Sequence, residues 1–168
     1  MGIKMKICSW NINSIRLREA QVLRLLRDEC PDVICFQECK SLVENIPRKN
    51  FYDLGYYYMA ARGQKSYNGV AIFSKIPISK EFSIDFADLG QARHITVRLE
   101  NGFTVHNFYV PAGGDEPNME TNLKFAQKIN FLNAMKDWFI SNTPKKAILV
   151  GDLNIAPDED DVWDHKKL

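Results

Sequence analysis

The architecture of the chain can be inferred from residues 6–36, which read KICSWNINSIRLREAQVLRLLRDECPDVICF. Lys6–Trp10 predicts a short strand that runs into a polar turn. Arg18–Cys30 predicts a helix, because its apolar residues recur at helical spacing and Pro31 ends it. Val33–Phe36 is continuously apolar, as is typical of a strand buried on both faces. A strand, a helix and a strand within about 30 residues form a βαβ unit, so these two strands are expected to be parallel.

The rest of the chain adds strands and one long helix, with no repeat and no interdomain linker. Asn101-Gly102 lies between two strand patterns and predicts a type I′ hairpin turn, whose two central residues need positive φ. The expected fold class is α/β with mixed sheets. The further elements expected are a short helix and loop over Ser41–Leu54, strands over Tyr56–Met59, Val70–Phe73, Ile95–Leu99 and Phe103–Val110, a helix over Asn122–Ile140 with Phe125, Ile129, Leu132 and Phe139 on one face, and a buried strand over Ala147–Val150.

Length and composition fit one globular domain. The chain has 168 residues, of which 45% are hydrophobic and 26% charged, values that argue against disorder and against a fibrous repeat. Its 22 basic and 21 acidic residues leave a net charge of +1. The segment from Asp152 onward is acidic, so the remainder is mildly basic. That distribution tolerates a polyanionic partner without demonstrating one.

The sequence shows no sign of a membrane or secretion route. No apolar run approaches the ~20 residues of a membrane span, and the amino-terminal residues contain no signal-peptide core. Without a secretion signal, the cysteines are expected to be reduced thiols; they are Cys8, Cys30, Cys35 and Cys39. We therefore expect a soluble, cytoplasmic protein with no membrane partner.

Polar side chains follow three of the apolar strands at their carboxyl ends. In open α/β sheets, ligands bind outside these ends. Two carboxylates with amide oxygens beside them suit a hard cation such as Mg²⁺ or Mn²⁺. Each residue taken alone could equally be a strand-end cap or a turn former. The residues are Asn11 and Asn13 after the first strand, Gln37 and Glu38 after the second, and Asp152 and Asn154 after the last.

Five motifs occur in a characteristic order. They are SWNINSIR (9–16), CFQECK (35–40), SYNGVAI (66–72), YVP (109–111) and GDLNIAP (151–157). Together they closely resemble the exonuclease III family, the DNA-repair branch of the endonuclease/exonuclease/phosphatase superfamily. The resemblance covers Lys6–Leu168, and Asp161–Leu168 is also similar to the family segment on the carboxyl side of the Asp-Leu-Asn motif.

The resemblance implies a role for each residue of the predicted site. Glu38 matches the metal-binding glutamate and Asn11 the asparagine beside it, with Mg²⁺ or Mn²⁺ as the cofactor. Asp152 matches the aspartate that orients or deprotonates the attacking water, and that also lies at the metal. Asn154 matches an asparagine that fixes the phosphate or the metal. Tyr109 matches a tyrosine whose hydroxyl contacts the scissile phosphate.

Other positions match residues that contact the DNA backbone in the family. Arg16, Tyr67 and Arg93 are such positions, and contacts of this kind set register rather than sequence preference. Arg62 and Lys65 lie in the same loop region as Tyr67 and would add to a phosphate-facing patch. For each residue a solvated or packing role is the alternative. The histidines match no catalytic position and are expected to be structural or surface residues; they are His94, His106 and His165.

The resemblance also implies a four-layer α/β/β/α sandwich, of which residues 1–168 would be the amino-terminal part, truncated after the Asp-Leu-Asn motif. The family's Ser-Asp-His motif would lie in the part that is absent. Ala112 stands where many members place an asparagine that reaches the phosphate. We therefore expect residues 1–168 alone to be nearly inactive and to self-associate through apolar sheet faces, here those built from Ile72, Val97, Phe108 and Val150.

Three functions are compatible with these residues and the resemblance. The first is a divalent-metal-dependent DNA-repair phosphodiesterase of the exodeoxyribonuclease III type, a 3′→5′ exonuclease and abasic-site endonuclease acting on duplex DNA with abasic or damaged 3′ ends. The second is a catalytically inactive remnant or DNA-binding fragment. The third is a phosphatase or phospholipid-cleaving relative within the same superfamily.

Overall fold

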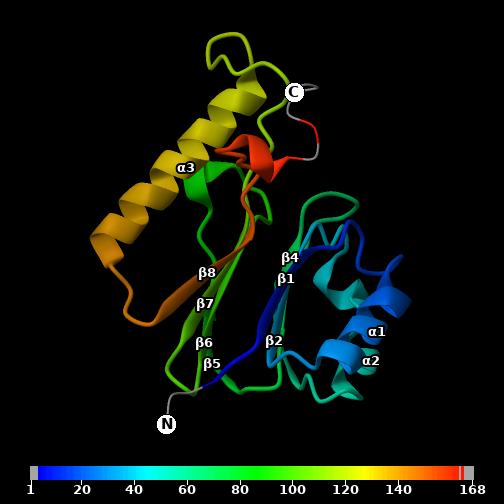
Figure 1. Cartoon of the computed structure of the whole chain (residues 1–168). Helices are drawn as coiled ribbons and strands as arrows, with labels where there is room; N and C mark the ends of the chain where they lie inside the picture. The colour runs from blue at the N-terminus through cyan, green and yellow to red at the C-terminus, as the bar shows by residue number, and fades with distance from the viewer. Residues whose placement is uncertain (1–3, 163, 165–168) are drawn as a thin grey trace.

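The computed structural model describes residues 4–162 and 164, and these residues form two four-stranded sheets (Figure 1). The first sheet has the strand order β1-β2-β4-β3. Its parallel pair, β1 with β2, confirms the predicted βαβ unit, and its other pairs are antiparallel. The strands are β1 (Ile7–Asn11), β2 (Val33–Gln37), β3 (Tyr58–Arg62) and β4 (Val70–Ser74).

The second sheet has the order β5-β6-β7-β8. Here β7 and β8 are parallel, whereas β5, β6 and β7 form antiparallel pairs. Each sheet therefore has one parallel pair, β1 with β2 and β7 with β8, and β1 lies next to β8 across the sandwich. The strands are β5 (Ile78–Phe82), β6 (His94–Leu99), β7 (Thr104–Tyr109) and β8 (Ala147–Asp152).

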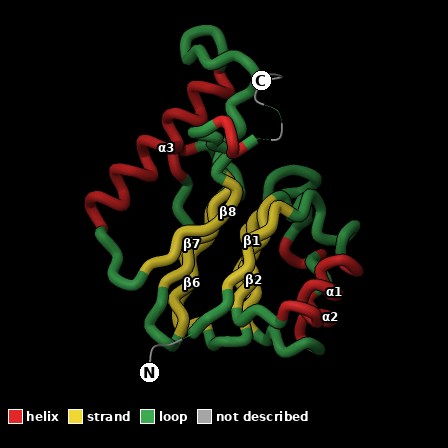
Figure 2. Tube along the Cα trace, viewed as in Figure 1, coloured by secondary structure: helices red, strands yellow, loops and turns green. Residues whose placement is uncertain are grey.

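Helices cover the outer faces of both sheets, which confirms the four-layer sandwich (Figures 1 and 2). Two short helices lie against the first sheet, and one long helix lies against the second. Asn122 begins the long helix, because its side chain accepts hydrogen bonds from the first-turn N–H groups of Lys124 and Phe125. The helices are α1 (Glu19–Glu29), α2 (Arg48–Tyr52) and α3 (Leu123–Asn142), with 3₁₀ turns η1 (Val43–Asn45), η2 (Phe86–Asp88) and η3 (Glu159–Asp161).

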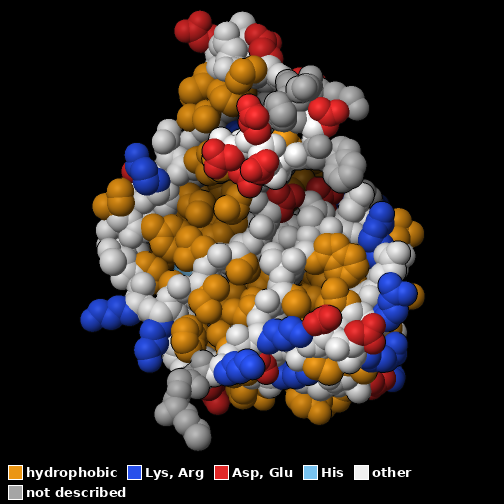
Figure 3. Space-filling view, in the orientation of Figure 1, with side chains coloured by type: hydrophobic (Ala, Val, Ile, Leu, Met, Phe, Trp, Pro, Cys, Tyr) orange, Lys and Arg blue, Asp and Glu red, His pale blue; other side chains and the backbone are white. Residues whose placement is uncertain are grey.

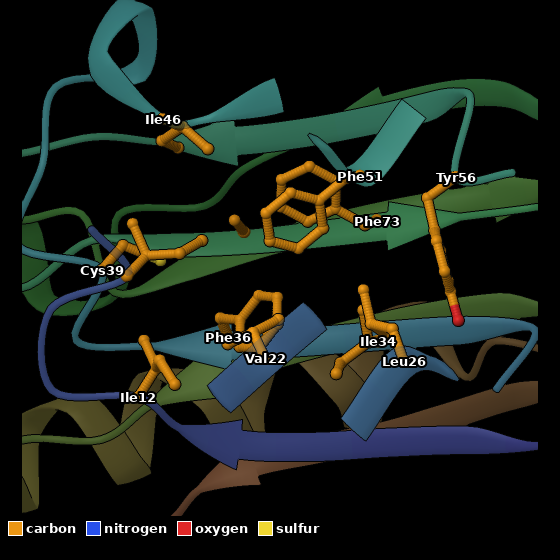
Figure 4. Packing of buried hydrophobic residues seen from close by; sticks show 12 residues of the cluster. Ile12, Val22, Leu26, Ile34, Phe36, Cys39, Ile46, Phe51, Tyr56 and Phe73 are labelled. Atoms are coloured by element: carbon orange, nitrogen blue, oxygen red, sulfur yellow. The ribbon is translucent and has the colours of Figure 1, made fainter. Parts of the chain in front are cut away.

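Separate apolar clusters hold the layers together. Between the first sheet and its helices, Phe36, Phe51 and Phe73 are fully buried, and the last two rings stack at 4.1 Å (Figure 4). Between the sheets, Cys35 and Val105 are fully buried within a second cluster. Burial of this kind, at about 25 cal/mol per Å² of apolar surface, supplies the main drive for the two sheets to associate.

The apolar faces that were expected to be exposed are largely covered. Ile72, Val97 and Phe108 have no exposed surface, and Val150 is half-buried. Ile72 and Val97 face the opposing sheet, and Phe108 lies beneath α3. The expectation that these residues are exposed is therefore wrong, because sheet and helix packing already covers them.

Several element boundaries differ from the prediction. β3 begins two residues later and ends three residues later than expected, because its pairing with β4 joins Tyr58 to Ser74 and Arg62 to Val70. β5 was not predicted, since its exposed middle residues give no apolar signal. β8 is partly exposed rather than buried, with Leu149 at 45% exposure.

The hairpin between β6 and β7 exists, but its turn is not type I′. Gly102 adopts a φ of 89°, whereas Asn101 does not have a positive φ. The Gly102 N–H donates to the Leu99 carbonyl at 3.0 Å, and the Leu99 N–H donates to the Phe103 carbonyl at 2.8 Å. A longer loop with glycine at its one left-handed position therefore replaces the two-residue turn.

The inner face of α3 is also shifted from the prediction. Its one buried residue is Phe131, which the helical pattern did not single out. All four residues of the expected face are half-buried, and Leu132 and Phe139 pack against the same cluster as Phe131. None of the helices formed by the described residues is long and apolar enough to cross a membrane.

Part of the expected family segment Asp161–Leu168 lies outside the described part of the chain, namely residues 163 and 165–168, which include His165.

Candidate active site

The candidate site lies where strands of the two sheets end side by side. Asn11 ends β1 and pairs with Gln37 at the end of β2, so Glu38 follows immediately. Tyr109 ends β7 and pairs with Asp152 at the end of β8. Both pairs are parallel, so each brings two carboxyl ends to one edge of its sheet, and β1 lies next to β8.

Asn11 stands at the centre of a cluster of hydrogen bonds. Its Nδ2 donates to Glu38 Oε1 at 3.0 Å and to Asp152 Oδ2 at 2.7 Å. The Tyr109 hydroxyl donates to the same Glu38 oxygen at 2.9 Å. The Asn11 Oδ1 accepts the Asn13 N–H at 3.2 Å, which agrees with this orientation of the amide. Four predicted site residues, from both sheets, thus come into direct contact.

The Glu38 carboxylate is held ionised by its neighbours. Its second oxygen forms an ion pair with Lys40 Nζ at 2.8 Å, and the same ammonium donates to Asn13 Oδ1 at 2.6 Å. Burial raises the pKa of the Glu38 carboxyl, but the hydrogen bonds from Asn11, Lys40 and Tyr109 outweigh it. The net pKa lies below the ordinary value for glutamate. A negative charge is therefore present here at neutral pH.

Tyr109 is kept as a neutral hydrogen-bond donor. Burial, together with the hydrogen bond to Glu38, raises the pKa of the Tyr109 phenol to about 12. The Arg93 guanidinium lies 4.7 Å from the centre of the Tyr109 ring and donates to the Tyr109 carbonyl at 3.2 Å. Only 7% of Arg93 is exposed, so most of its side chain is packed against Tyr109.

Asp152 and Asn154 form a compact turn after β8. The Asn154 N–H donates to Asp152 Oδ1 at 3.1 Å, and the Asn154 side-chain amide donates to the Val110 carbonyl at 2.8 Å. Lys128 of α3 donates to the Asn154 carbonyl and, at 3.2 Å, to the Ala112 carbonyl. Asn154 therefore shapes the loop beside Asp152 and joins the loops after β7 and β8.

The residues expected to contact DNA surround this cluster. Arg16 is exposed and lines a hollow of about 730 Å³ together with Lys40. Tyr67 is 54% exposed and lines a hollow of about 290 Å³ with Arg93 and Tyr109. Arg62 is exposed at the carboxyl end of β3. His94 and His106 are buried beneath α3, away from these hollows, as expected of structural histidines.

Two lysines of the site were not predicted from the sequence. Lys40 supplies the positive charge on Glu38, and its place two residues after Glu38 in the CFQECK motif was the available signal. Lys128 lies on α3, far from the motifs in sequence, and no local pattern marks it. Its contact with the loop depends on how α3 packs.

The donor set fits a hard divalent cation. No group of three or more His, Cys, Asp or Glu side chains able to hold a metal occurs in the part of the chain that the structure describes. The cluster instead offers two carboxylates, Glu38 and Asp152, joined through the Asn11 amide. Mg²⁺ is commonly held by one or two carboxylates while it keeps several waters, so these residues fit it.

Family membership follows from the extent of a sequence match. A model of the endonuclease/exonuclease/phosphatase family matches residues 8–168, which include the whole hydrogen-bonded cluster. The chain belongs to this family. Among curated relatives, the exodeoxyribonuclease III of Haemophilus influenzae is 34% identical over 166 residues, a match that covers 94% of this chain and 60% of that protein.

Solved structures of family members share the fold. An AP endonuclease from Archaeoglobus fulgidus superposes with a TM-score of 0.86 at 30% identity, covering 98% of this chain and 63% of that one. A 3′ phosphatase from Neisseria, solved bound to product DNA hairpin, gives 0.84 at 32% identity with the same coverage. The chain therefore spans less than two thirds of the length of each of these relatives.

Proposed function

We propose that this family member is a divalent-metal-dependent DNA-repair phosphodiesterase, with 3′→5′ exonuclease and abasic-site endonuclease activities on duplex DNA. The observation that carries the proposal is the contact of Asn11 with both Glu38 and Asp152, with Tyr109 on the same Glu38 oxygen. The likeness to an exodeoxyribonuclease III, an AP endonuclease and a DNA-bound 3′ phosphatase supports DNA as the substrate class.

In this proposal the side chains of the cluster have different tasks. Glu38, with Asn11 beside it, holds Mg²⁺ or Mn²⁺; once bound, such an ion neutralises charge on the phosphate as a Lewis acid. Asp152 orients a water and accepts its proton, since water is a weak nucleophile at neutral pH. Tyr109 is protonated at neutral pH, and on substrate binding its hydroxyl would donate its hydrogen bond to a phosphate oxygen in place of Glu38. Asn154 holds the loop that carries Asp152.

Cations around the cluster fit a polyanionic substrate. We infer that Arg16 and Lys40 contact the backbone of one DNA segment and that Tyr67 contacts another, with Arg62 on the periphery. Contacts of this kind position a duplex without reading its sequence. Residues 8–168 would then be the amino-terminal part of the catalytic domain, consistent with a match to about 60% of the relatives' length.

A second candidate activity uses the same residues. Removal of a 3′ phosphate requires the same charge neutralisation and the same activated water, and one similar structure is a 3′ phosphatase bound to product DNA. A duplex with an internal abasic site and a duplex with a 3′-phosphate end, assayed side by side, distinguish the two activities.

The proposed function is tested with Glu38→Ala in the full-length protein. Cleavage of an abasic duplex in Mg²⁺ is expected to fall by at least about a thousandfold, and EDTA is expected to abolish parent activity. Glu29→Ala is the matched control, because Glu29 is an exposed glutamate paired with Lys6. Parent-level cleavage by Glu38→Ala, or full activity in EDTA, would show that the assignment is wrong.

A further inference from the structure

A pair of buried amides joins the two sheets directly behind the site. Gln37 ends β2 and Asn107 lies in β7, and their exposed fractions are 1% and 0%. The Gln37 Nε2 donates to Asn107 Oδ1 at 2.6 Å, and to Ser9 Oγ of β1 at 3.1 Å. Elsewhere the interface between the sheets is mainly apolar. A polar link at this depth therefore needs an explanation beyond burial.

The three hydrogen bonds of the Asn107 side chain all join it to the opposite sheet. Its Nδ2 donates to the Phe36 carbonyl at 2.9 Å and to the Ala71 carbonyl at 3.1 Å, while its Oδ1 accepts from Gln37. Phe36 and Ala71 are partners in the β2–β4 ladder. Leaving one such buried group without a partner is unfavourable, because the group then loses its solvation without gaining a hydrogen bond. A shift of one sheet against the other would break three hydrogen bonds together.

The amide pair is adjacent in sequence to the two residues that meet across the sheets. Gln37 directly precedes Glu38. Asn107 precedes Tyr109 by two residues, so the side chains of Asn107 and Tyr109 lie on the same face of β7. The Tyr109 hydroxyl reaches Glu38 Oε1 at 2.9 Å. An apolar interface resists sliding weakly because its contacts are non-directional, whereas hydrogen bonds fix position.

We propose that Gln37 and Asn107 are positioning residues, which set the register between the sheets so that Tyr109 and Asn11 meet the Glu38 carboxylate. The inference rests on the proposed function for its link to metal binding and cleavage, but the positioning itself concerns only this chain's own contacts. The pair touches neither the proposed metal nor the substrate, and it acts through Glu38 and Tyr109.

The test measures the Tyr109–Glu38 contact directly. In protein labelled with ¹³Cζ-tyrosine, the NMR signal of Tyr109 is the one that disappears in Tyr109→Phe. The change in its chemical shift caused by Glu38→Gln reports the Tyr109–Glu38 hydrogen bond and is called the Tyr109 response. In the background of the double variant Gln37→Leu/Asn107→Leu, the Tyr109 response is expected to be lost. Asn107→Leu alone would leave the buried Gln37 amide without its Asn107 acceptor. The double variant removes both side-chain amides and is therefore less prone to unfold. Gln37→Met serves as a milder second variant.

The matched control is Thr96→Val. Thr96 is fully buried, hydrogen-bonded and in the neighbouring strand β6, but its partners are His94 and His106 rather than the opposite sheet. Thr96→Val is expected to lower thermal stability and leave the Tyr109 response intact. A full Tyr109 response in both amide variants would overturn the positioning role.

Mn²⁺ affinity, measured by electron paramagnetic resonance of the free ion, separates this inference from the proposed function. We expect about a tenfold loss of Mn²⁺ affinity in the double variant and none in Thr96→Val. Loss of the Tyr109 response in a protein whose parent form binds no Mn²⁺ supports the positioning role and contradicts the metal-dependent function. Mn²⁺ binding by the parent, with an unchanged Tyr109 response in the variants, supports the function and overturns the positioning role.

Discussion

Glu38 is held in an unfavourable backbone conformation directly after β2. Its φ is 53°, in the left-handed region that costs a non-glycine residue about 1–3 kcal/mol. The next two residues secure it, since the Cys39 N–H donates to the Gly69 carbonyl at 3.0 Å and the Lys40 N–H to the Asn68 carbonyl at 2.8 Å. This turn directs the Glu38 carboxylate toward Asn11 instead of continuing β2.

Asp152→Asn keeps the shape of the side chain and removes its charge. If Asp152 handles the attacking water, the turnover rate is expected to fall by at least about a hundredfold. DNA binding measured in Ca²⁺ should stay equal or tighten, because one charge that repels phosphate is lost. Asp53→Asn is the control, since Asp53 is an exposed residue paired with Lys49. Weaker binding at unchanged turnover would instead indicate a structural aspartate.

Gly151→Ala should displace the next residue in the chain, Asp152. A Cβ at Gly151 would overlap the Phe108 carbonyl oxygen, in a backbone with a φ of 140°. Gly55 also has a positive φ, 89°, but a Cβ there meets nothing within 4 Å. Urea unfolding should show a loss of about 1–3 kcal/mol for Gly55→Ala and a larger loss for Gly151→Ala. Equal losses of unfolding free energy in the two variants would mean that β7 and β8 move to accommodate the added methyl group.

At the scale of elements, α3 covers a buried pair of histidines. The His94 Nδ1 accepts the Ile84 N–H at 3.0 Å, so neutral His94 carries its proton on Nε2, 2.8 Å from Thr96 Oγ1. The Thr96 hydroxyl can then donate to His106 Nδ1 at 2.9 Å, which leaves the His106 proton on Nε2, a buried atom with no hydrogen-bond partner among the described residues. This network needs both rings neutral.

The histidine pair should make the fold sensitive to acid. Burial lowers the pKa of His94 to about 3, with His106 adding to the effect, and burial lowers the pKa of His106 to about 4. Because the unfolded chain takes up protons near the ordinary histidine pKa of about 6.5, the full stability is present above that pH. It should decline as the pH falls from about 6.5 toward 4, by about 1.4 kcal/mol per ring for each pH unit.

Urea unfolding at about pH 7.5 and about pH 5 measures this loss. His106→Phe, which replaces one ring among the aromatic side chains of Trp138 and Phe139, should reduce the difference between the two pH values. An equal acid sensitivity in His106→Phe would assign the loss to other groups.

At the scale of the whole molecule, apolar side chains remain on one face. Figure 3 shows them gathered over α3 and β8. β8 is an edge strand of the second sheet as described, and β1 is an edge strand of the first. Leu149 of β8 is 45% exposed. Unpaired strand edges with apolar side chains favour association with other chains.

Residues 1–168 by themselves are therefore expected to self-associate. Size-exclusion chromatography with light scattering should show species larger than the 19.4 kDa monomer. Leu149→Lys should shift the distribution toward monomer, whereas Leu17→Lys, at an 81% exposed site before α1, should not. A monodisperse monomer for the parent chain would contradict the prediction.

Many of the secondary-structure elements of this protein can be predicted from local sequence. The βαβ unit, the long helix and the β6–β7 hairpin are recognisable from short-range periodicity and from residues that end elements, such as Pro31. The five motifs indicated the exonuclease III branch of the endonuclease/exonuclease/phosphatase family, and the match over residues 8–168 confirms the wider family. They also selected Asn11, Glu38 and Asp152, because ligands of open α/β sheets bind outside the carboxyl ends of strands, and strand ends can be recognised in the sequence.

Contacts between distant segments were decided only by the tertiary structure. Asn11 and Asp152 are 141 positions apart, and their contact depends on how β1 packs beside β8. The burial of Arg93 under Tyr109 and the Gln37–Asn107 link between the sheets gave no local signal. Periodicity reports which face of a strand is apolar, but not which strand it will face. That pairing is set by the packing of whole sheets, where the burial of apolar surface and the need to satisfy every buried polar group act together.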